Sequence, residues 1–269
     1  MSFQWPEGYR AGAFITFDVD GVVGFEGSAI GSLQNRPCVR SMTDYEPRVG
    51  VPRILSVLDD AAVPATFFIP GKLAELYPDM VKNILRAGHE VGHHGHFHYK
   101  PDRISFEDEV KEIDLALPIL EDLIGDKVFG SRTPGWAPSA NTLKLLAERG
   151  MLYDSSLMGH DEPYRTTEGL LELPCLWSLD DWEQWGYLPF EGWEYPIEEP
   201  DKVKRMWNAH FQAIVEAGGS FVLTLHPWIS GRPVYAKVLK DLLMEWKNTP
   251  GVWWTNAKEL TLYANSLEL

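Results

Sequence analysis

The chain has 269 residues, with 39 acidic against 24 basic side chains and a formal net charge of −15. Hydrophobic residues make up 45% of it, which is ordinary for a folded protein, and the length suits one large α/β domain. The negative charge argues against nucleic acid and anionic lipid as partners, because both would repel it. We therefore expect one domain over residues 1–269 that binds neither nucleic acid nor membranes.

The first residues and the two cysteines indicate the compartment. Before Ala13 the chain has neither the basic start nor the apolar run of a secretory signal, and no apolar run is long enough to cross a membrane. Cys38 and Cys175 lie far apart and match no metal-ligand or redox spacing. These features predict a cytoplasmic protein in a reducing compartment.

Strand-like and helix-like segments alternate along the chain. The strand-like segments are 13–17, 64–69, 171–175, 221–225 and 252–255. Helical patterns lie at about 50–61, 72–87, 105–124, 201–217, 234–247 and 256–266. The clearest is 105–124, where apolar residues recur at three- and four-residue steps after a capping box of Ser105 and Asp108. Strands that alternate with helices predict a parallel sheet with helices outside it.

Two long stretches, 24–47 and 176–200, carry no regular pattern, and such loops usually serve function or an interface. The second stretch holds four tryptophans, Trp177, Trp182, Trp185 and Trp193. These side chains could pack between subunits or form the wall of a ligand site. Because exposed aromatic patches are rare on monomers, we expect a homo-oligomer, a tetramer rather than a dimer, with these tryptophans interfacial or lining the pocket.

Five of the eight histidines fall within residues 89–98. Imidazole is the commonest metal ligand, so this density predicts a metal site. His94 and His98 would lie roughly 13 Å apart in a strand but on one face of a helical turn. We therefore expect a strand to end and a helical turn to begin near residues 92–95. Structural roles are favoured for His93 and His96, and the role of His160 stays open.

Asp18 and Asp20 follow the first strand. Side chains two residues apart on a strand point to the same side, so both carboxylates should emerge together at its carboxyl end, where barrel active sites lie. One could bind a metal while the other serves as a base. The alternative, two solvated turn acids, is common for an isolated Asp-x-Asp-Gly.

Two other segments carry chemistry. His226 ends the apolar strand 221–225, and Arg132 lies in a tight loop before Trp136. Each signal is weak alone, since a strand-terminal histidine can cap a core and an arginine can form a surface ion pair.

Together these segments resemble the polysaccharide deacetylase superfamily, also called the NodB-homology family. The matching motifs, in order, are Thr16–Asp20, His94–His98, Arg132–Pro134, Asp154–Met158 and Leu223–His226. The resemblance spans about residues 13–260 and implies a distorted (β/α) barrel, one divalent metal ion and hydrolysis of an amide-type C–N bond.

The resemblance also implies roles by position. Asp18 would be the catalytic base, oriented by Arg132, and His226 the acid. The metal ligands would be Asp20, His94 and His98. One carboxylate and two imidazoles suit zinc, with manganese, cobalt or nickel as alternatives.

The chain departs from the family pattern at Val19, Gly95 and Met158. These departures are similar to a branch that contains peptidoglycan deacetylase-like proteins, cyclic imide hydrolases and metal-independent allantoinases, as are segments 50–55, 179–182 and 226–233. In such a protein we expect four residues to contact the substrate, namely Trp136, Asp161, Trp182 and Trp228.

Three functions follow as alternatives. The first is a hydrolase of a small cyclic imide or amide, in which a water molecule bound by the metal is the nucleophile, Asp18 takes its proton and His226 protonates the leaving nitrogen. The second is a deacetylase of N-acetylated sugars or peptidoglycan. The third is a catalytically silent binding or scaffold barrel, against which the presence of all the core residues argues.

Overall fold

The computed structural model describes residues 2–27, 33–188 and 194–267. Its strands are β1 (Ala11–Asp18), β2 (Ala65–Ile69), β3 (Glu90–His93), β4 (Gly130–Ser131), β5 (Tyr153–Asp154), β6 (Tyr164–Arg165), β7 (Leu171–Glu172), β8 (Ser220–Leu225) and β9 (Val252–Trp254). They form one sheet in the order β6-β7-β5-β4-β3-β2-β1-β8, with β9 beside the first residues of β1.

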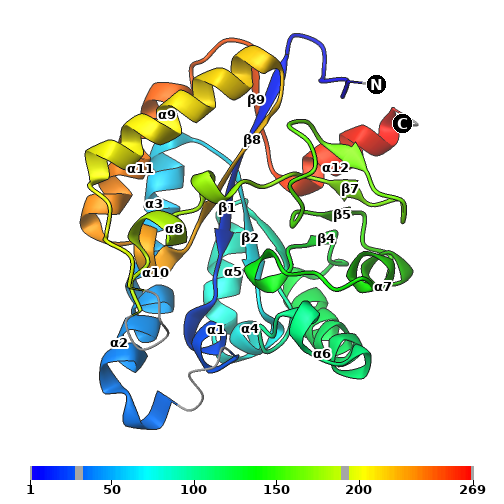
Figure 1. Ribbon diagram of the computed structural model, residues 1–269, viewed down its shortest axis with the longest axis vertical. Coiled ribbons are helices and arrows are strands. Elements are labelled where there is room, and N and C mark those ends of the chain that lie inside the picture. The colour runs from blue at the N-terminus through cyan, green and yellow to red at the C-terminus, as the bar shows by residue number, and fades with distance from the viewer. Residues whose placement is uncertain (1, 28–32, 189–193, 268–269) are drawn as a thin grey trace.

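Helices surround this curled sheet (Figure 1). The α-helices are α1 (Gly21–Gly27), α2 (Pro37–Tyr45), α3 (Val51–Ala61), α4 (Gly71–Leu76), α5 (Pro78–Arg86), α6 (Phe106–Ile124), α7 (Thr142–Glu148), α8 (Trp182–Trp185), α9 (Pro200–Ala217), α10 (Pro227–Ser230), α11 (Pro233–Trp246) and α12 (Ala257–Ser266). Shorter turns include the π-helix η2 (Glu46–Gly50) and the 3-10 helices η4 (Pro134–Trp136) and η5 (Trp177–Leu179). The predicted distorted (β/α) barrel is confirmed.

The direction of the strands gathers their carboxyl ends. β1 pairs in parallel with β2 and with β8, and β2 pairs in parallel with β3. Residues that follow these strands therefore meet at one edge of the barrel, which is the edge that parallel α/β folds use for their sites.

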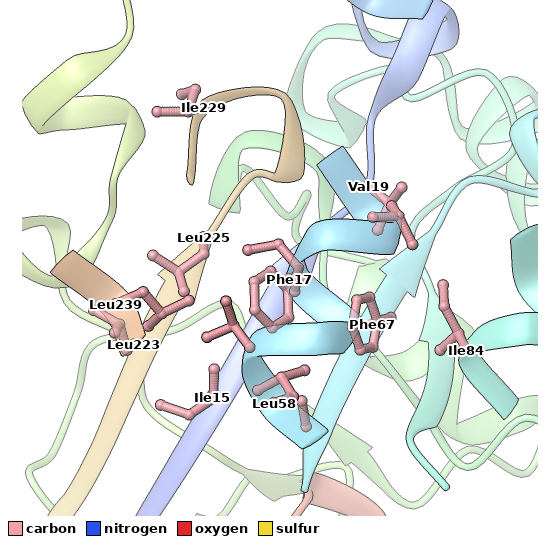
Figure 2. Packing of buried hydrophobic residues seen from close by; sticks show 14 of the residues in the cluster. Ile15, Phe17, Val19, Leu58, Phe67, Ile84, Leu223, Leu225, Ile229 and Leu239 are labelled. Atoms are coloured by element: carbon pink, nitrogen blue, oxygen red, sulfur yellow. The ribbon is translucent and has the colours of Figure 1, made fainter. Parts of the chain in front are cut away.

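The alternation of side chains along β1 decides which residues reach that site. Ile15 and Phe17 face outward and pack with Leu58 of α3 and Leu239 of α11 (Figure 2). Phe14 faces the opposite side of the sheet, in a separate apolar cluster. Because strand side chains alternate with a period of two, Asp18 continues the row of Phe14, away from α3 and α11.

The helix predicted over 105–124 is confirmed, and the Ser105 hydroxyl accepts a hydrogen bond from the amide of Asp108 at its start. The prediction of one continuous helix near 72–87 is wrong, because the segment is divided at Pro78 into α4 and α5. A proline disfavours helical backbone at the residue before it, and Tyr77 has φ −131°.

Two further predictions are corrected. The stretch 24–47 is not irregular where it is described, because α2 and the end of α1 lie within it. The strand predicted near 171–175 is only the two-residue β7.

The tryptophans of the stretch 176–200 have different environments. Trp185 is buried in the core and stacks on Tyr235 with ring centroids 4.1 Å apart, so for this residue the expectation of an interfacial or pocket-lining position is wrong. Trp177 is 47% exposed, and Trp193 lies outside the described residues. Within the described segments, no helix is both long enough and apolar enough to cross a membrane.

Candidate active site

The carboxyl ends of β1, β3 and β8 bring the predicted catalytic and metal-binding residues together. Asp18 is the last residue of β1, His94 follows β3 and His226 follows β8. All three are almost fully buried. Asp20 lies among them, with its Oδ1 3.4 Å from His94 Nε2 and its Oδ2 3.8 Å from His226 Nε2.

Asp20, His94 and His98 form a group that could hold a metal ion. Their ligand atoms all lie within 4.8 Å of one another, and Asp20 Oδ1 is 3.2 Å from His98 Nε2. That Oδ1 is buried and has no hydrogen-bond donor among the described residues. Burial opposes ionisation of Asp20, but His98 and His94 in their protonated forms outweigh it and hold its pKa well below the usual value.

The orientation of the His94 ring supports this assignment. Its Nδ1 lies 2.7 Å from the carbonyl oxygen of Arg132, which can only accept, so Nδ1 carries a proton. In a neutral imidazole, Nε2 then presents a lone pair to Asp20 Oδ1. Two acceptors that face each other in a buried site fit a cation between them, and the donor set suits a divalent transition metal.

The chain between His94 and His98 is not the predicted helical turn. Gly95 and His98 both have positive φ values, 71° and 61°, which fold the segment back on itself. The Glu112 carboxylate of α6 accepts hydrogen bonds from the amides of His96 and Phe97 at 2.9 and 2.8 Å. The bend leaves the His94 and His98 rings 4.9 Å apart, so the two histidines meet as expected but by a different backbone route.

The remaining histidines named from the sequence lie outside this group. His93 Nδ1 pairs with the Ser131 hydroxyl at 2.9 Å, and burial lowers its pKa to about 3, so it stays neutral. His96 packs against the ring of Phe97. His160 Nδ1 accepts a hydrogen bond from the amide of Glu162.

Arg132 holds Asp18 in place. Its Nη1 donates to Asp18 Oδ1 at 2.9 Å and to the Thr16 hydroxyl at 2.8 Å, while Nε donates to the carbonyl of Ser155. The guanidinium is fully buried and lies 4.5 Å from the ring centroid of Phe68. Five fixed donors on a buried planar group leave Asp18 little freedom to turn.

The aspartate that holds His226 is Asp181. Its Oδ1 lies 2.7 Å from His226 Nδ1, and it also accepts from the His226 amide and the Ser230 hydroxyl. Burial disfavours a charged His226, but Asp180 and Asp181 outweigh it and raise its pKa well above the usual value. With Nδ1 bound to Asp181, Nε2 faces the site and can carry a proton toward it.

Asp154, which aligned with a family motif, pairs with Glu172. The Ser156 hydroxyl donates to its Oδ1 at 3.0 Å. Burial raises the pKa of Asp154 to about 6, so this pair holds a proton away from the site.

The predicted substrate-binding residues fall into two groups. Trp182 lies 5.4 Å from the His226 ring, Trp228 lies 5.3 Å from Trp182, and Trp136 lies 5.9 Å from the Arg132 guanidinium. Asp161 lies away from the other three residues. Its carbonyl accepts a hydrogen bond from the amide of Ser220, at the opposite end of β8 from His226. It does not face the site of its own chain.

Comparison with known proteins agrees with this geometry. The sequence model of the polysaccharide deacetylase family matches residues 33–153. A crystal structure from Mycobacterium smegmatis, assigned as a polysaccharide deacetylase, is 37% identical, with 100% of this chain and 94% of that chain covered and a TM-score of 0.95. The chain belongs to the polysaccharide deacetylase family. It is therefore a hydrolase of C–N bonds other than peptide bonds.

Two further relatives of this deacetylase-family protein have lower sequence identity. The peptidoglycan deacetylase of Helicobacter pylori is 28% identical over 90% of this chain and 92% of its own. A crystal structure of an allantoinase is 21% identical, covers 97% of this chain and 92% of its own, and has a TM-score of 0.83, which shows a shared fold.

Sequence reasoning missed two acidic residues of this deacetylase-family site. Asp181 lies in segment 179–182, which is similar to the branch, but that similarity assigns no role to Asp181. Glu46 is fully buried beside the site and precedes segment 50–55. Its neighbours in the sequence do not indicate this burial, because an acidic residue at the end of an apparent loop is expected to face solvent. Only the backbone of η2 turns it inward.

Proposed function

We propose that this deacetylase-family protein is a metal-dependent hydrolase that opens a small cyclic imide or amide by adding water across one C–N bond. The observation that carries the proposal is the buried Asp20 Oδ1, which faces His94 Nε2 and His98 Nε2 without a hydrogen-bond donor among the described residues. Asp20, His94 and His98 would hold one divalent ion, with zinc the first candidate. When bound, it supplies Lewis acidity for the carbonyl and the attacking water.

The side chains of this chain would carry the protons. Asp18, fixed by Arg132, accepts a proton from the attacking water as its oxygen bonds to the carbonyl carbon. His226 donates the Nε2 proton to the ring nitrogen as the C–N bond breaks, while Asp181 holds Nδ1. The product is an open carboxylate amide, and proton exchange with solvent restores Asp18 and His226.

Aromatic side chains support a small flat substrate. Trp182 contacts the ring of His226 edge-on, and Trp228 and Phe25 extend this wall. We propose that Trp136, Trp182 and Trp228 line the substrate site. The allantoinase with the same fold indicates that this scaffold also serves enzymes other than polysaccharide deacetylases.

A deacetylase of N-acetylated sugars is the second candidate, favoured by the peptidoglycan deacetylase of Helicobacter pylori, whose length the match almost spans. Both candidates use the same residues, so turnover separates them. Purified protein with zinc is offered succinimide-type rings and N-acetylglucosamine oligomers, with Asp18→Asn as the inactive control. We expect ring opening by the wild type alone; acetate release from the oligomers without ring opening would make the second candidate correct.

We also propose that the protein is a homo-oligomer, a tetramer rather than a dimer. Trp177 is 47% exposed, and its ring centroid lies 4.5 Å from that of Trp136. An exposed tryptophan at this position supports a subunit interface or a covered pocket beside it. Light scattering at micromolar concentration should show more than one chain, and a monomer would contradict the proposal.

A further inference from the structure

Glu46 connects two loops of the site from behind. It is fully buried on the π-helix η2, and its two carboxylate oxygens accept hydrogen bonds from different segments. Oε2 accepts from the amide of Gly21, the residue after Asp20. Oε1 accepts from the amide of Trp228, two residues after His226, at 3.2 Å. One side chain therefore joins the loop that bears Asp20 to the loop that bears His226.

The backbone around Glu46 is packed closely enough to make this connection rigid. A Cβ atom on Gly50 would lie 2.4 Å from the carbonyl oxygen of Pro227, and one on Gly231 would lie 2.6 Å from Gly50 Cα. Thus η2 and α10 touch backbone to backbone. The Tyr45 hydroxyl donates to the carbonyl of Gly231 at 2.7 Å, on the same side. π-Helical turns occur frequently at functional sites, which agrees with this position.

A carboxylate at this position is unfavourable unless it has a specific task. Burial, and then the charge of Asp20, raise the pKa of Glu46 well above the usual value. Buried backbone amides need hydrogen-bond acceptors, and Glu46 supplies one oxygen to the amide of Gly21 and the other to the amide of Trp228. A glutamine has only one oxygen, so it could satisfy one of these amides and not both.

We propose that Glu46 is a positioning residue for hydrolysis: it fixes Asp20 relative to His226, whose facing atoms Oδ2 and Nε2 lie 3.8 Å apart. The inference rests on the proposed function, because it assigns Asp20 to the metal and His226 to proton donation. Glu46 acts through the amides that follow these residues and touches neither substrate nor metal. Loss of one hydrogen bond lets one loop drift while the fold stays intact.

Glu46→Gln tests the inference, and Glu90→Gln is the matched control. Glu90 is also a buried carboxylate that accepts a backbone amide, that of Lys258, but it lies at the opposite end of β3 from His93. The two substitutions make the same chemical change in the same barrel. Glu46→Asp, which retains the carboxyl group but is too short to span both amides, serves as a second variant should Glu46→Gln not fold.

Three measurements separate positioning from general stability: the melting temperature, the Co²⁺ affinity with its visible spectrum, and KM against kcat on the ring substrate. We expect both glutamine variants to melt at lower temperature. Glu46→Gln alone should weaken Co²⁺ binding by about tenfold or more, change the spectrum and lower kcat about tenfold with little change in KM. Glu46→Asp should behave alike.

The inference would be overturned if Glu46→Gln bound Co²⁺ with the affinity and spectrum of the wild type. It would also be overturned if Glu90→Gln lost as much Co²⁺ affinity and kcat as Glu46→Gln. A wild-type protein that binds no Co²⁺ would overturn the proposed function, and this inference with it. A wild type that binds Co²⁺ beside an unchanged Glu46→Gln overturns the inference alone. The two failures are therefore distinguishable.

Discussion

Two carboxylates buried in the same barrel, Asp20 and Glu90, have opposite surroundings. Glu90 accepts hydrogen bonds from the hydroxyls of Thr66 and Tyr153 at 2.8 Å each and from the amide of Lys258 at 2.9 Å. Asp20 Oδ1 faces ring nitrogens of His94 and His98 and has no donor among the described residues. Burial alone therefore does not distinguish a structural acid from a functional one; the nature of its partners does.

The contrast follows from position along the strands. Glu90 begins β3, where Thr66 of β2 and the start of α12 supply donors. Asp20 lies beyond the carboxyl end of β1, where loops after β3 and β8 converge. A surrounding of donors satisfies a carboxylate completely, whereas a surrounding of acceptors leaves a place for a cation.

Asp18→Asn should have the largest effect, because it separates the base from the metal ligand two residues away. The amide cannot accept the proton of water, so kcat should fall by about 10²–10⁴-fold. Metal content should stay at the wild-type level, since Asp18 is not in the ligand group. Asp20→Ala should lose both the metal and turnover. If Asp18→Asn lost the metal and Asp20→Ala kept it, the roles of the two aspartates would be exchanged.

Glu90→Gln should be destabilising without affecting catalysis. One of its three donors would face an amide nitrogen, which lowers the free energy of unfolding by about 1–3 kcal/mol. Denaturant unfolding measures this loss, and metal content should equal that of the wild type. Lost metal at unchanged stability would mean that Glu90 is coupled to the site and that the contrast with Asp20 is false.

Asp154→Asn should have a smaller, pH-dependent effect. Asp154 is a third kind of buried acid, with its pKa raised by burial from 3.8 to about 6. The folded state then binds the proton more tightly than the unfolded chain, so stability falls as the pH rises between these values. Compared with Asp154→Asn, the wild type should lose about 1–2 kcal/mol of stability between about pH 5 and pH 7. Parallel pH curves would show that the Asp154–Glu172 pair does not share a proton.

The sequence predicted the regular parts of the molecule well. Apolar periodicity identified α6, and the spacing of Asp18 and Asp20 predicted that both carboxylates reach the same edge. Such inferences need only local rules of helices and strands. The barrel itself followed from the motif resemblance together with the alternating elements.

The rest could not be predicted because long-range packing decides it. The bend at His98 depends on Glu112 of α6, and the burial of Trp185 depends on Tyr235 of α11. Asp181 holds His226 because a β-bridge between Asp180 and Thr224 aligns the segment beside β8. The cytoplasmic location and the oligomeric state stay predictions.

Metal content shows directly whether Asp20, His94 and His98 form a cation site. Purified protein is stripped with a chelator, reloaded with zinc and dialysed, and the metal per chain is determined by elemental analysis alongside Asp20→Ala, His94→Ala and His98→Ala. We expect one ion per wild-type chain and none in any of the three variants, with turnover that requires the ion. A metal-free wild-type protein that retains full turnover, or an Asp20→Ala variant that keeps its ion, would contradict this expectation.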